Sequence, residues 1–245
     1  MKTNKKKTLI KKQDYKKRIP VGIQDFDKLI EGGFKNNTTN LISGGAGSGK
    51  TIFAIEYLYN GINKYKENGL YITFEEKKEG LYGDMKEFGW NLEELEKENK
   101  FFFLEYTPEQ VKNILVEGGG FVESMIQKNK IKRIVIDSIS SFALLYQDEL
   151  TRKEAALALI GMITSWECTA LLTSQEESEQ NLFVSAALEF EVDSIIILYN
   201  SKKKGERIRA MEILKMRGTQ HTTKTFKFEI TNKGFVVHPN NKIDF

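Results

Sequence analysis

Residues 41 to 51, Leu-Ile-Ser-Gly-Gly-Ala-Gly-Ser-Gly-Lys-Thr, decide the fold. Within them Gly44, Gly49, Lys50 and Thr51 match the G-x-x-x-x-G-K-[ST] pattern of a phosphate-binding loop. Closely spaced glycines let the backbone turn with several N–H groups pointing toward one anion. A helix that begins at about Gly49 adds the positive end of its dipole. The stretch therefore predicts a cradle for the phosphates of a nucleotide.

The flanks of this loop have the expected character. Residues 40–43 are predicted to be a short buried strand, and residues 52–58 a helix with an apolar face. An ordinary glycine-rich turn is the alternative, but it does not require Lys-Thr between a strand and a helix. In this type of loop Lys50 reaches the β- and γ-phosphates, and the Thr51 hydroxyl ligates Mg²⁺.

Composition places the chain among soluble globular proteins. The 245 residues are 40% hydrophobic and 29% charged, which allows a substantial core. No apolar run approaches the length of a membrane-spanning helix, and the basic N-terminus lacks the apolar segment of a signal peptide. The single Cys168 cannot form an internal disulfide, and we expect a reducing, cytoplasmic location.

Charge is distributed unevenly along the chain. Residues 1–18 carry nine Lys or Arg and one Asp, a balance of +8, so the rest carries 3 − 8 = −5. We expect residues 1–17 to be a flexible basic tail and residues 18–245 to form the domain. Such a tail suits nucleic acid, an acidic partner or an anionic membrane surface, although a solvated leader is the simpler interpretation.

Short apolar strands alternate with helical segments along the domain. A short helix is expected before the phosphate loop, at 24–30. After the loop, strands are expected at 69–74, 101–106, 133–138, 170–175 and 194–199, and helices at 79–88, 108–128 (interrupted at the glycines 118–120) and 148–166. The last fifty residues favour antiparallel strands at 208–216, 225–230 and 234–238. This order predicts an α/β fold with a mainly parallel central sheet, helices on both faces and antiparallel strands extending one side.

Three carboxylates are candidates for the chemistry. Asp137 ends an apolar strand and suits the Mg²⁺ shell, although a helix N-cap is an alternative role. Glu75 and Glu76 end another strand, at the edge where open α/β sheets bind ligands. Adjacent residues of an extended chain point in opposite directions, so one carboxylate would face the γ-phosphate and activate water. The other carboxylate would orient the first one or raise its pKa, because two like charges lie close together.

Two further polar segments are candidates. Thr173-Ser174-Gln175 ends a strand at the ligand edge, where small polar groups sense a γ-phosphate, although an ordinary strand exit is equally consistent. Lys215 and Arg217 lie on one face of an extended segment and suit a phosphoryl group. They are far from the phosphate loop in sequence, so the phosphate that they contact could belong to a nucleotide on a neighbouring subunit. A solvated edge strand is the alternative.

Several motifs together resemble the KaiC-type ATPase domain of the RecA-like P-loop superfamily. The resemblance covers about residues 18 to 238. It rests on Gly22–Asp27 with Gly32-Gly33, the phosphate loop, Tyr71–Glu76, Phe88-Gly89-Trp90, Val135–Ser138 and Lys215-Met216-Arg217-Gly218-Thr219-Gln220-His221. The first and last segments are more specific to the family than the phosphate loop itself. Archaeal proteins of this kind often contain a single such domain.

The resemblance implies a homo-oligomer, with a hexameric ring favoured and ATP between subunits. It assigns triphosphate binding to Gly45, Ala46, Gly47, Ser48, Gly49, Lys50 and Thr51, and Mg²⁺ binding to Thr51 and Asp137. It makes Glu75 and Glu76 the catalytic pair beside Lys50. It further implies that Lys215 and Arg217 reach the γ-phosphate of the adjacent subunit's ATP, with Met216, Thr219 and His221 lining that nucleotide.

One departure narrows the expected activity. The autophosphorylating domain of KaiC has a Ser-Thr pair four and three residues before an Asp, and here Glu189 and Phe190 precede Asp193. The chain therefore resembles the KaiC domain that hydrolyses ATP without phosphorylating itself. Phosphorylation at those two positions is chemically excluded, whereas Ser185 leaves a shifted site open.

Two other functions are consistent with the sequence. A RecA- or RadA-like recombination ATPase would place basic loops after the fourth and fifth strands, but residues 146–149 and 176–180 are acidic and would repel DNA. A slow nucleotide sensor that recruits a regulatory or motility partner is the second alternative. The intact Glu75-Glu76 pair favours an active ATPase, and no nucleic-acid partner is expected except through the basic tail.

Overall fold

The strand that precedes the phosphate loop lies inside a nine-stranded mixed sheet. The order of the strands is β11-β10-β9-β8-β3-β7-β6-β4-β5. The computed structural model describes residues 17–117, 119–143, 145–146, 148–175, 190–203 and 205–242. Predictions for the basic tail, for residues 176–180 and for Ser185 and Glu189 lie outside the described residues.

The elements of the described chain follow the predicted alternation. Their bounds are β1 (Arg18–Ile19), η1 (Asp27–Ile30), β2 (Phe34–Lys35), β3 (Thr39–Gly44), α1 (Lys50–Tyr65), β4 (Asn68–Thr73), α2 (Lys78–Lys86), α3 (Leu92–Lys97), β5 (Phe101–Glu105), α4 (Pro108–Glu117), α5 (Gly120–Asn129), β6 (Ile131–Asp137), α6 (Ile139–Ala143), α7 (Glu149–Ser165), β7 (Thr169–Gln175), β8 (Ser194–Lys203), β9 (Glu206–Met216), β10 (Phe226–Thr231) and β11 (Gly234–Lys242).

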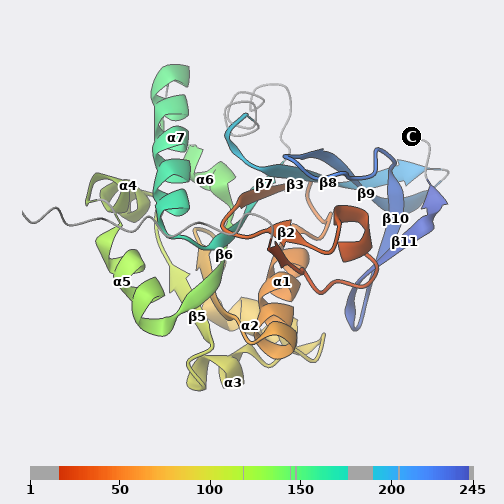
Figure 1. The fold of residues 1–245 in the computed structure, drawn as a ribbon, viewed down its shortest axis with the longest axis horizontal. Coiled ribbons are helices and arrows are strands. Elements are labelled where there is room, and N and C mark those ends of the chain that lie inside the picture. The colour runs from red at the N-terminus through yellow and green to blue at the C-terminus, as the bar shows by residue number, and fades with distance from the viewer. Residues whose placement is uncertain are drawn as a thin grey trace, which may run out of the picture.

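Alternating side chains of the central strands enter two separate cores. Along β6, Ile134 and Ile136 pack with α5 and α7, whereas Val135 between them packs with α1. This is the two-residue period of a strand that is covered on both faces. Figure 1 shows α4, α5 and α7 grouped at one side of the sheet and α1 to α3 at the other, with β9 to β11 at the end of the sheet far from α4, α5 and α7.

Strand direction sets where the ligand edge lies. The strands β3, β4, β5, β6, β7 and β8 are parallel, and β9, β10 and β11 continue the sheet in antiparallel fashion. The predicted α/β class with C-terminal antiparallel strands is therefore confirmed. In a parallel sheet the carboxyl ends of all strands meet at one edge, which brings the loops after β3, β4, β6 and β7 together.

Several local predictions differ from the structure. The helix expected at residues 24–30 is a single 3-10 turn at Asp27–Ile30. The Asp27 carboxylate accepts hydrogen bonds from the N–H groups of Val21 and Gly22, and these bonds hold the preceding segment in a non-helical turn. The helix α3 was not predicted, and Asn91 caps its first turn. The interruption of the helix at residues 118–120 is confirmed by the separate helices α4 and α5.

The β10–β11 hairpin packs against α1 through a buried carboxyl group. Glu56 of α1 is only 5% exposed, and its Oε2 atom accepts a hydrogen bond of 2.7 Å from the N–H of Phe235. Burial raises the pKa of Glu56 from 4.5 to about 7, against the lowering effect of the hydrogen bonds from Phe235 and Asn60. The hairpin is thus held to the phosphate-loop helix by a group that titrates near neutrality.

We predict that Glu56→Gln removes a pH dependence of stability. The folded protein favours the neutral form of the Glu56 carboxyl group. The contribution of Glu56 to stability is therefore complete below about pH 4.5 and is lost as the pH rises through about 7. The loss amounts to at most about 3 to 4 kcal/mol, for a shift from 4.5 to about 7 at roughly 1.4 kcal/mol per pKa unit. Urea unfolding between about pH 5 and pH 9 should show a smaller decline for Glu56→Gln than for the parent protein.

Glu87→Gln is the matched control, because Glu87 is an exposed glutamate at the end of α2. This variant should keep the parent's dependence on pH. An unchanged decline in Glu56→Gln would show that Glu56 does not carry it.

Candidate nucleotide site

The phosphate loop has a backbone that only glycine suits at its key positions. Gly47 and Gly49 adopt left-handed φ angles of 70° and 99°. A Cβ atom on Gly49 would lie 2.7 Å from Ile230 Cδ1 and 2.9 Å from Phe235 Cζ, both in the β10–β11 hairpin. The loop is therefore shaped between the end of β3 and this hairpin, and α1 begins immediately after it at Lys50.

Lys50 and Ser48 are the polar side chains of the loop that bear on anion binding. Lys50 Nζ donates to the carbonyl oxygens of Gly44 at 2.8 Å and Gly45 at 3.1 Å. The Ser48 hydroxyl is buried and has no hydrogen-bond partner within the described part of the chain. A cationic amine together with a buried, unsatisfied hydroxyl at a helix N-terminus is an environment suited to anionic oxygens.

Asp137 is the centre of the polar network beneath the loop. Its Oδ2 atom accepts hydrogen bonds from Thr51 Oγ1 at 2.8 Å and from Tyr71 OH at 2.7 Å. Its Oδ1 atom accepts a hydrogen bond from Thr173 Oγ1. Burial, followed by the charge of Asp137, raises the pKa of Tyr71 well above its ordinary value, so the phenol remains a donor. The predicted partners Thr51 and Asp137 are thus in direct contact.

The strand that carries Asp137, β6, is not the immediate neighbour of β3 in the sheet. The strand β7 lies between β3 and β6 in the sheet. The side chain of Thr51, which projects from the first turn of α1, spans this gap to reach the carboxylate. Thr173 of the intervening strand β7 bonds to the same carboxylate, which explains how a small polar group at that strand end joins the site.

The donor atoms fit a magnesium ion better than a transition metal. A threonine hydroxyl and one carboxylate are hard oxygen ligands, and Mg²⁺ usually takes only one or two protein ligands beside water and phosphate oxygens. In the described ranges no three His, Cys, Asp or Glu side chains are grouped so as to hold a metal ion on their own. A cation at Thr51 and Asp137 would therefore depend on phosphate oxygens for the rest of its shell.

Glu75 and Glu76 lie just past the end of β4. The strand ends at Thr73, whose Oγ1 accepts hydrogen bonds from both glutamate N–H groups, at 3.2 Å and 2.9 Å. The Glu75 carboxylate accepts a hydrogen bond from Ser141 of α6. Partial desolvation raises the pKa of Glu76, which is exposed in the single chain, and Asp137, Asp84 and then Glu75 add smaller effects, so like-charge proximity is not the main cause.

A cavity that no sequence motif indicates adjoins the loop. The strands β9 and β10 pair only at Met211–Phe226 and Ala210–Lys227, and beyond these pairs they diverge around a cavity of about 640 Å³. Arg209 and Ile230 line it, and Arg209 Nε donates to Gly47 O at 3.4 Å. Asn200 of β8 donates to the neighbouring Ala46 carbonyl. No local motif marks these residues, because strand pairing alone brings them to the loop.

Lys215 and Arg217 lie at the opposite end of the sheet from the phosphate loop. Met216 pairs with Ser194 of β8, whereas Gly44 is level with Leu198, four residues and about 13 Å further along that strand. Lys215 Nζ donates to the Phe190 carbonyl at 3.4 Å, and the Arg217 guanidinium donates to the carbonyls of Phe190 and Glu191. The two cations share a face, as predicted, but one chain does not bring them to its own loop.

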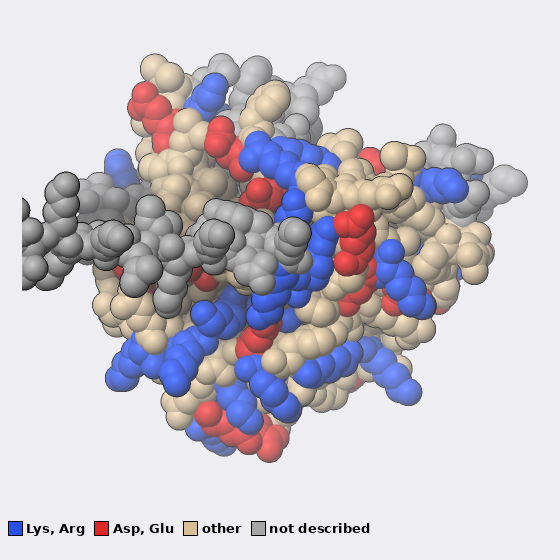
Figure 2. All heavy atoms as spheres, viewed as in Figure 1, with Lys and Arg blue, Asp and Glu red and all other residues tan. Residues whose placement is uncertain are grey.

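Further positive charge surrounds this segment. Arg18 Nη1 donates to Thr219 Oγ1 at 2.8 Å, and Lys35 Nζ lies beside Gly218. His221 Nδ1 is 2.9 Å from the carbonyl oxygen of Thr222, so the ring is fixed locally. Figure 2 shows lysine and arginine side chains gathered across the centre of one face, with acidic side chains scattered among them. An anionic group is the partner that suits such a surface.

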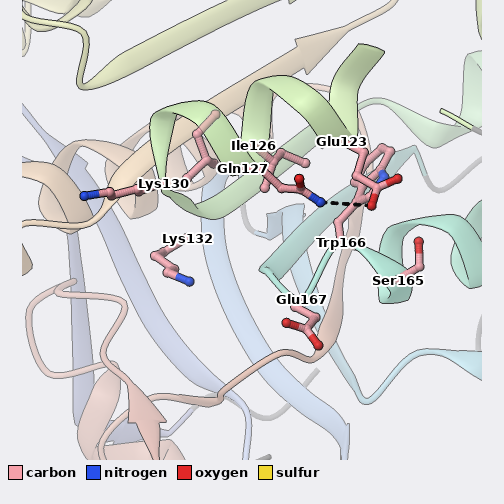
Figure 3. Close-up of a pocket in the computed structure, with 9 residues that line it drawn as sticks. Glu123, Ile126, Gln127, Lys130, Lys132, Ser165, Trp166 and Glu167 are labelled. Atoms are coloured by element: carbon pink, nitrogen blue, oxygen red, sulfur yellow. Dashed lines mark hydrogen bonds between the residues drawn. The ribbon is translucent and has the colours of Figure 1, made fainter. Parts of the chain in front are cut away.

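A second cavity of about 540 Å³ lies between α5, the start of β6 and the turn after α7. Figure 3 shows Lys130 and Lys132 on one side of it and Glu123 and Trp166 on the other. Acids and lysines contribute about equally to its lining, so it offers no clear preference for a triphosphate. It also lies where β6 and β7 begin, away from the edge that carries the phosphate loop.

The fold and the site define a RecA-like P-loop NTPase domain. The family model that describes the KaiC ATPase matches residues 19–242. The KaiC circadian clock oscillator proteins of Parasynechococcus marenigrum and Prochlorococcus marinus are each 32% identical over 229 residues, or 91% of this chain. The crystal structure of a KaiC-like protein from the archaeon Pyrococcus horikoshii is 36% identical, with a TM-score of 0.81. This chain belongs to the KaiC ATPase family.

Coverage differs between these relatives. The chain spans 45% and 46% of the two clock proteins, less than half of their length, but 99% of the Pyrococcus horikoshii chain and 91% of its own length. The similarity therefore concerns one KaiC-like domain. None of the helices in the described part of the chain combines the length and the apolar character needed to span a membrane.

We predict that Gly49→Ala disrupts the loop. The left-handed φ angle and the close approach of Ile230 and Phe235 should together lower the free energy of unfolding by about 2 kcal/mol or more. Nucleotide affinity should fall as well, and both can be measured by urea unfolding and calorimetric titration. Gly80→Ala in α2, where nothing lies within 4 Å, should be neutral or stabilising by up to about 1 kcal/mol. Equal effects of the two substitutions would contradict this account.

Proposed function

We propose that this domain binds ATP with Mg²⁺ and hydrolyses it to ADP and phosphate. The observation that carries the proposal is the contact between Thr51 of the phosphate loop and Asp137 at the carboxyl end of β6. This pair, directly beneath a glycine-rich loop with Lys50 in its concavity, is the arrangement that phosphoryl transfer requires. Membership of the KaiC ATPase family supports the same activity.

Each residue of the loop has a distinct task in this proposal. The backbone N–H groups of Gly45, Ala46, Gly47, Ser48 and Gly49 surround the β-phosphate, and Lys50 neutralises charge on the β- and γ-phosphates. Thr51 and Asp137 hold Mg²⁺, which when bound neutralises charge on the phosphate oxygens. The ribose and base extend into the cavity between β9 and β10, beside Arg209 and Ile230.

Glu75 and Glu76 are the proposed catalytic pair. Glu76 has a raised pKa, which makes its carboxylate a better proton acceptor than an ordinary glutamate. The Glu75 carboxylate accepts a hydrogen bond from the Ser141 hydroxyl, which fixes the side chain. The Glu75 N–H donates to Thr73 Oγ1, which fixes the bend of the backbone after β4. In this proposal Glu76 takes the proton of the attacking water while Glu75 holds the water in line.

The proposed active unit is a homo-oligomer, with a hexameric ring favoured. Lys215 and Arg217 lie about 13 Å along the sheet from their own phosphate loop, so they suit the γ-phosphate of an adjacent subunit. Met216, Thr219 and His221 would line that nucleotide from the same side. Head-to-tail contacts of this kind close into rings or extend as filaments.

We further propose a regulatory role, in which hydrolysis drives a change in the ring that a protein partner recognises. Phe190, one of the two positions expected to differ from an autokinase, is 74% exposed and has no hydroxyl to phosphorylate. ATP hydrolysis rather than self-phosphorylation is accordingly the proposed reaction.

We predict that Glu75→Gln and Glu76→Gln each reduce phosphate release by about 100-fold or more while ATP affinity changes less than about threefold. The amide keeps the shape of the side chain but cannot accept the proton. Phosphate release and calorimetric titration with Mg-ATP give the two quantities. Glu79→Gln, an exposed glutamate of α2, is the control. Retained hydrolysis in both variants would remove these glutamates from the mechanism.

A mixing experiment tests the shared site. Lys50→Ala chains lack a working loop, and chains with Lys215→Ala and Arg217→Ala lack the proposed donors. Each variant should be nearly inactive alone, whereas random co-assembly restores intact interfaces at about one quarter of positions. Recovery to about 25% of parent activity is expected, with assembly followed by light scattering with and without Mg-ATP. No recovery in co-assembled particles, or full activity in a monomer, would contradict sharing.

A further inference from the structure

Asp137 has more hydrogen-bond donors than a minimal magnesium site requires. Thr51 and Thr173 reach it from the strand and helix beside the loop. The third donor, the hydroxyl of Tyr71, comes from β4 and lies 2.7 Å from Oδ2, the same atom that Thr51 contacts. The carboxylate is only 6% exposed, so protein donors rather than bulk water determine its orientation.

Core packing alone does not account for the phenol oxygen of Tyr71. The ring is fully buried and stacks on Phe103, with centroids 5.7 Å apart and an interplanar angle of 22°. A phenylalanine would fill the same space, and a buried hydroxyl requires a partner. The oxygen of Tyr71 finds that partner in Asp137, which makes the pair a polar contact within an apolar layer.

We propose that Tyr71 is a positioning residue that holds the Asp137 carboxylate in the orientation needed to receive Mg²⁺ together with bound nucleotide. This inference rests on the proposed function of Thr51 and Asp137. Ligating carboxylates depend on outer hydrogen bonds for their orientation, and loss of such a bond usually costs about 10–100-fold in metal affinity. Tyr71 holds one oxygen from β4 and Thr173 holds the other from β7, so the carboxylate plane is fixed from two strands.

The test is Tyr71→Phe, which removes one oxygen atom. ATP affinity is measured by calorimetry across a Mg²⁺ titration and again with the metal chelated. The Mg²⁺ concentration for half-maximal enhancement of ATP affinity should rise about tenfold, whereas affinity without metal should stay within about twofold of the parent. A general loss of structure would instead weaken ATP binding both with and without the metal. Tyr71→Met, which also lacks the donor, gives a second test if Tyr71→Phe is not obtained folded.

Tyr57→Phe is the matched control. Tyr57 is also fully buried, and its hydroxyl donates to the Thr169 carbonyl at 3.0 Å, at the opposite end of β7 from Thr173. This variant should leave the magnesium dependence unchanged. An unchanged dependence in Tyr71→Phe, or a shift equal to that of Tyr57→Phe, would overturn the inference.

Asp137→Asn separates this inference from the proposed function. If Asp137→Asn removes the effect of Mg²⁺ and Tyr71→Phe does not alter it, the positioning role of Tyr71 is wrong and the metal site stands. If Asp137→Asn itself leaves the effect of Mg²⁺ intact, the proposed metal site is wrong, and the inference is overturned with it.

Discussion

The buried carboxylate of Asp137 is the interaction on which the site depends. A carboxylate that is 6% exposed is tolerated only when donors replace the water it has lost, and here donors arrive from α1, β4 and β7. Those three elements meet because the parallel strands end at one edge. The network therefore links the start of the phosphate-loop helix to the strand that leads into Glu75 and Glu76, and fixes their relative positions.

The strand directions that bring these groups to one edge of the sheet also place Lys215 and Arg217 at the opposite edge. The strand β9 runs antiparallel to β8, so its last residues return to the edge where β8 begins. Two cations that suit a phosphoryl group thus lie at the opposite edge of the sheet, where they donate hydrogen bonds to the carbonyls of Phe190 and Glu191. The separation follows from topology rather than from loop placement, and it is the physical basis for expecting a site shared between chains.

The sequence predicted what depends on local pattern. The glycine spacing predicted the loop, apolar periodicity predicted β3, β4 and β6, and Asp137 followed from its place at a strand end. Features that depend on strand order were not predictable in this way. The insertion of β7 between β3 and β6, the contact from Tyr71 to Asp137 and the cavity beside Arg209 all require knowledge of which strands are neighbours.

The antiparallel strands at the end of the chain are more than an extension of the sheet. Ile230 and Phe235 approach Gly49 so closely that a side chain there would collide, and Phe235 also meets Phe53 of α1 edge to face at 5.4 Å. Glu56 binds the backbone of the same hairpin from α1. The shape of the phosphate loop is therefore set jointly by α1 and by residues almost two hundred positions later. The hairpin therefore limits what the loop can accommodate at Gly49, because no room for a side chain remains between them.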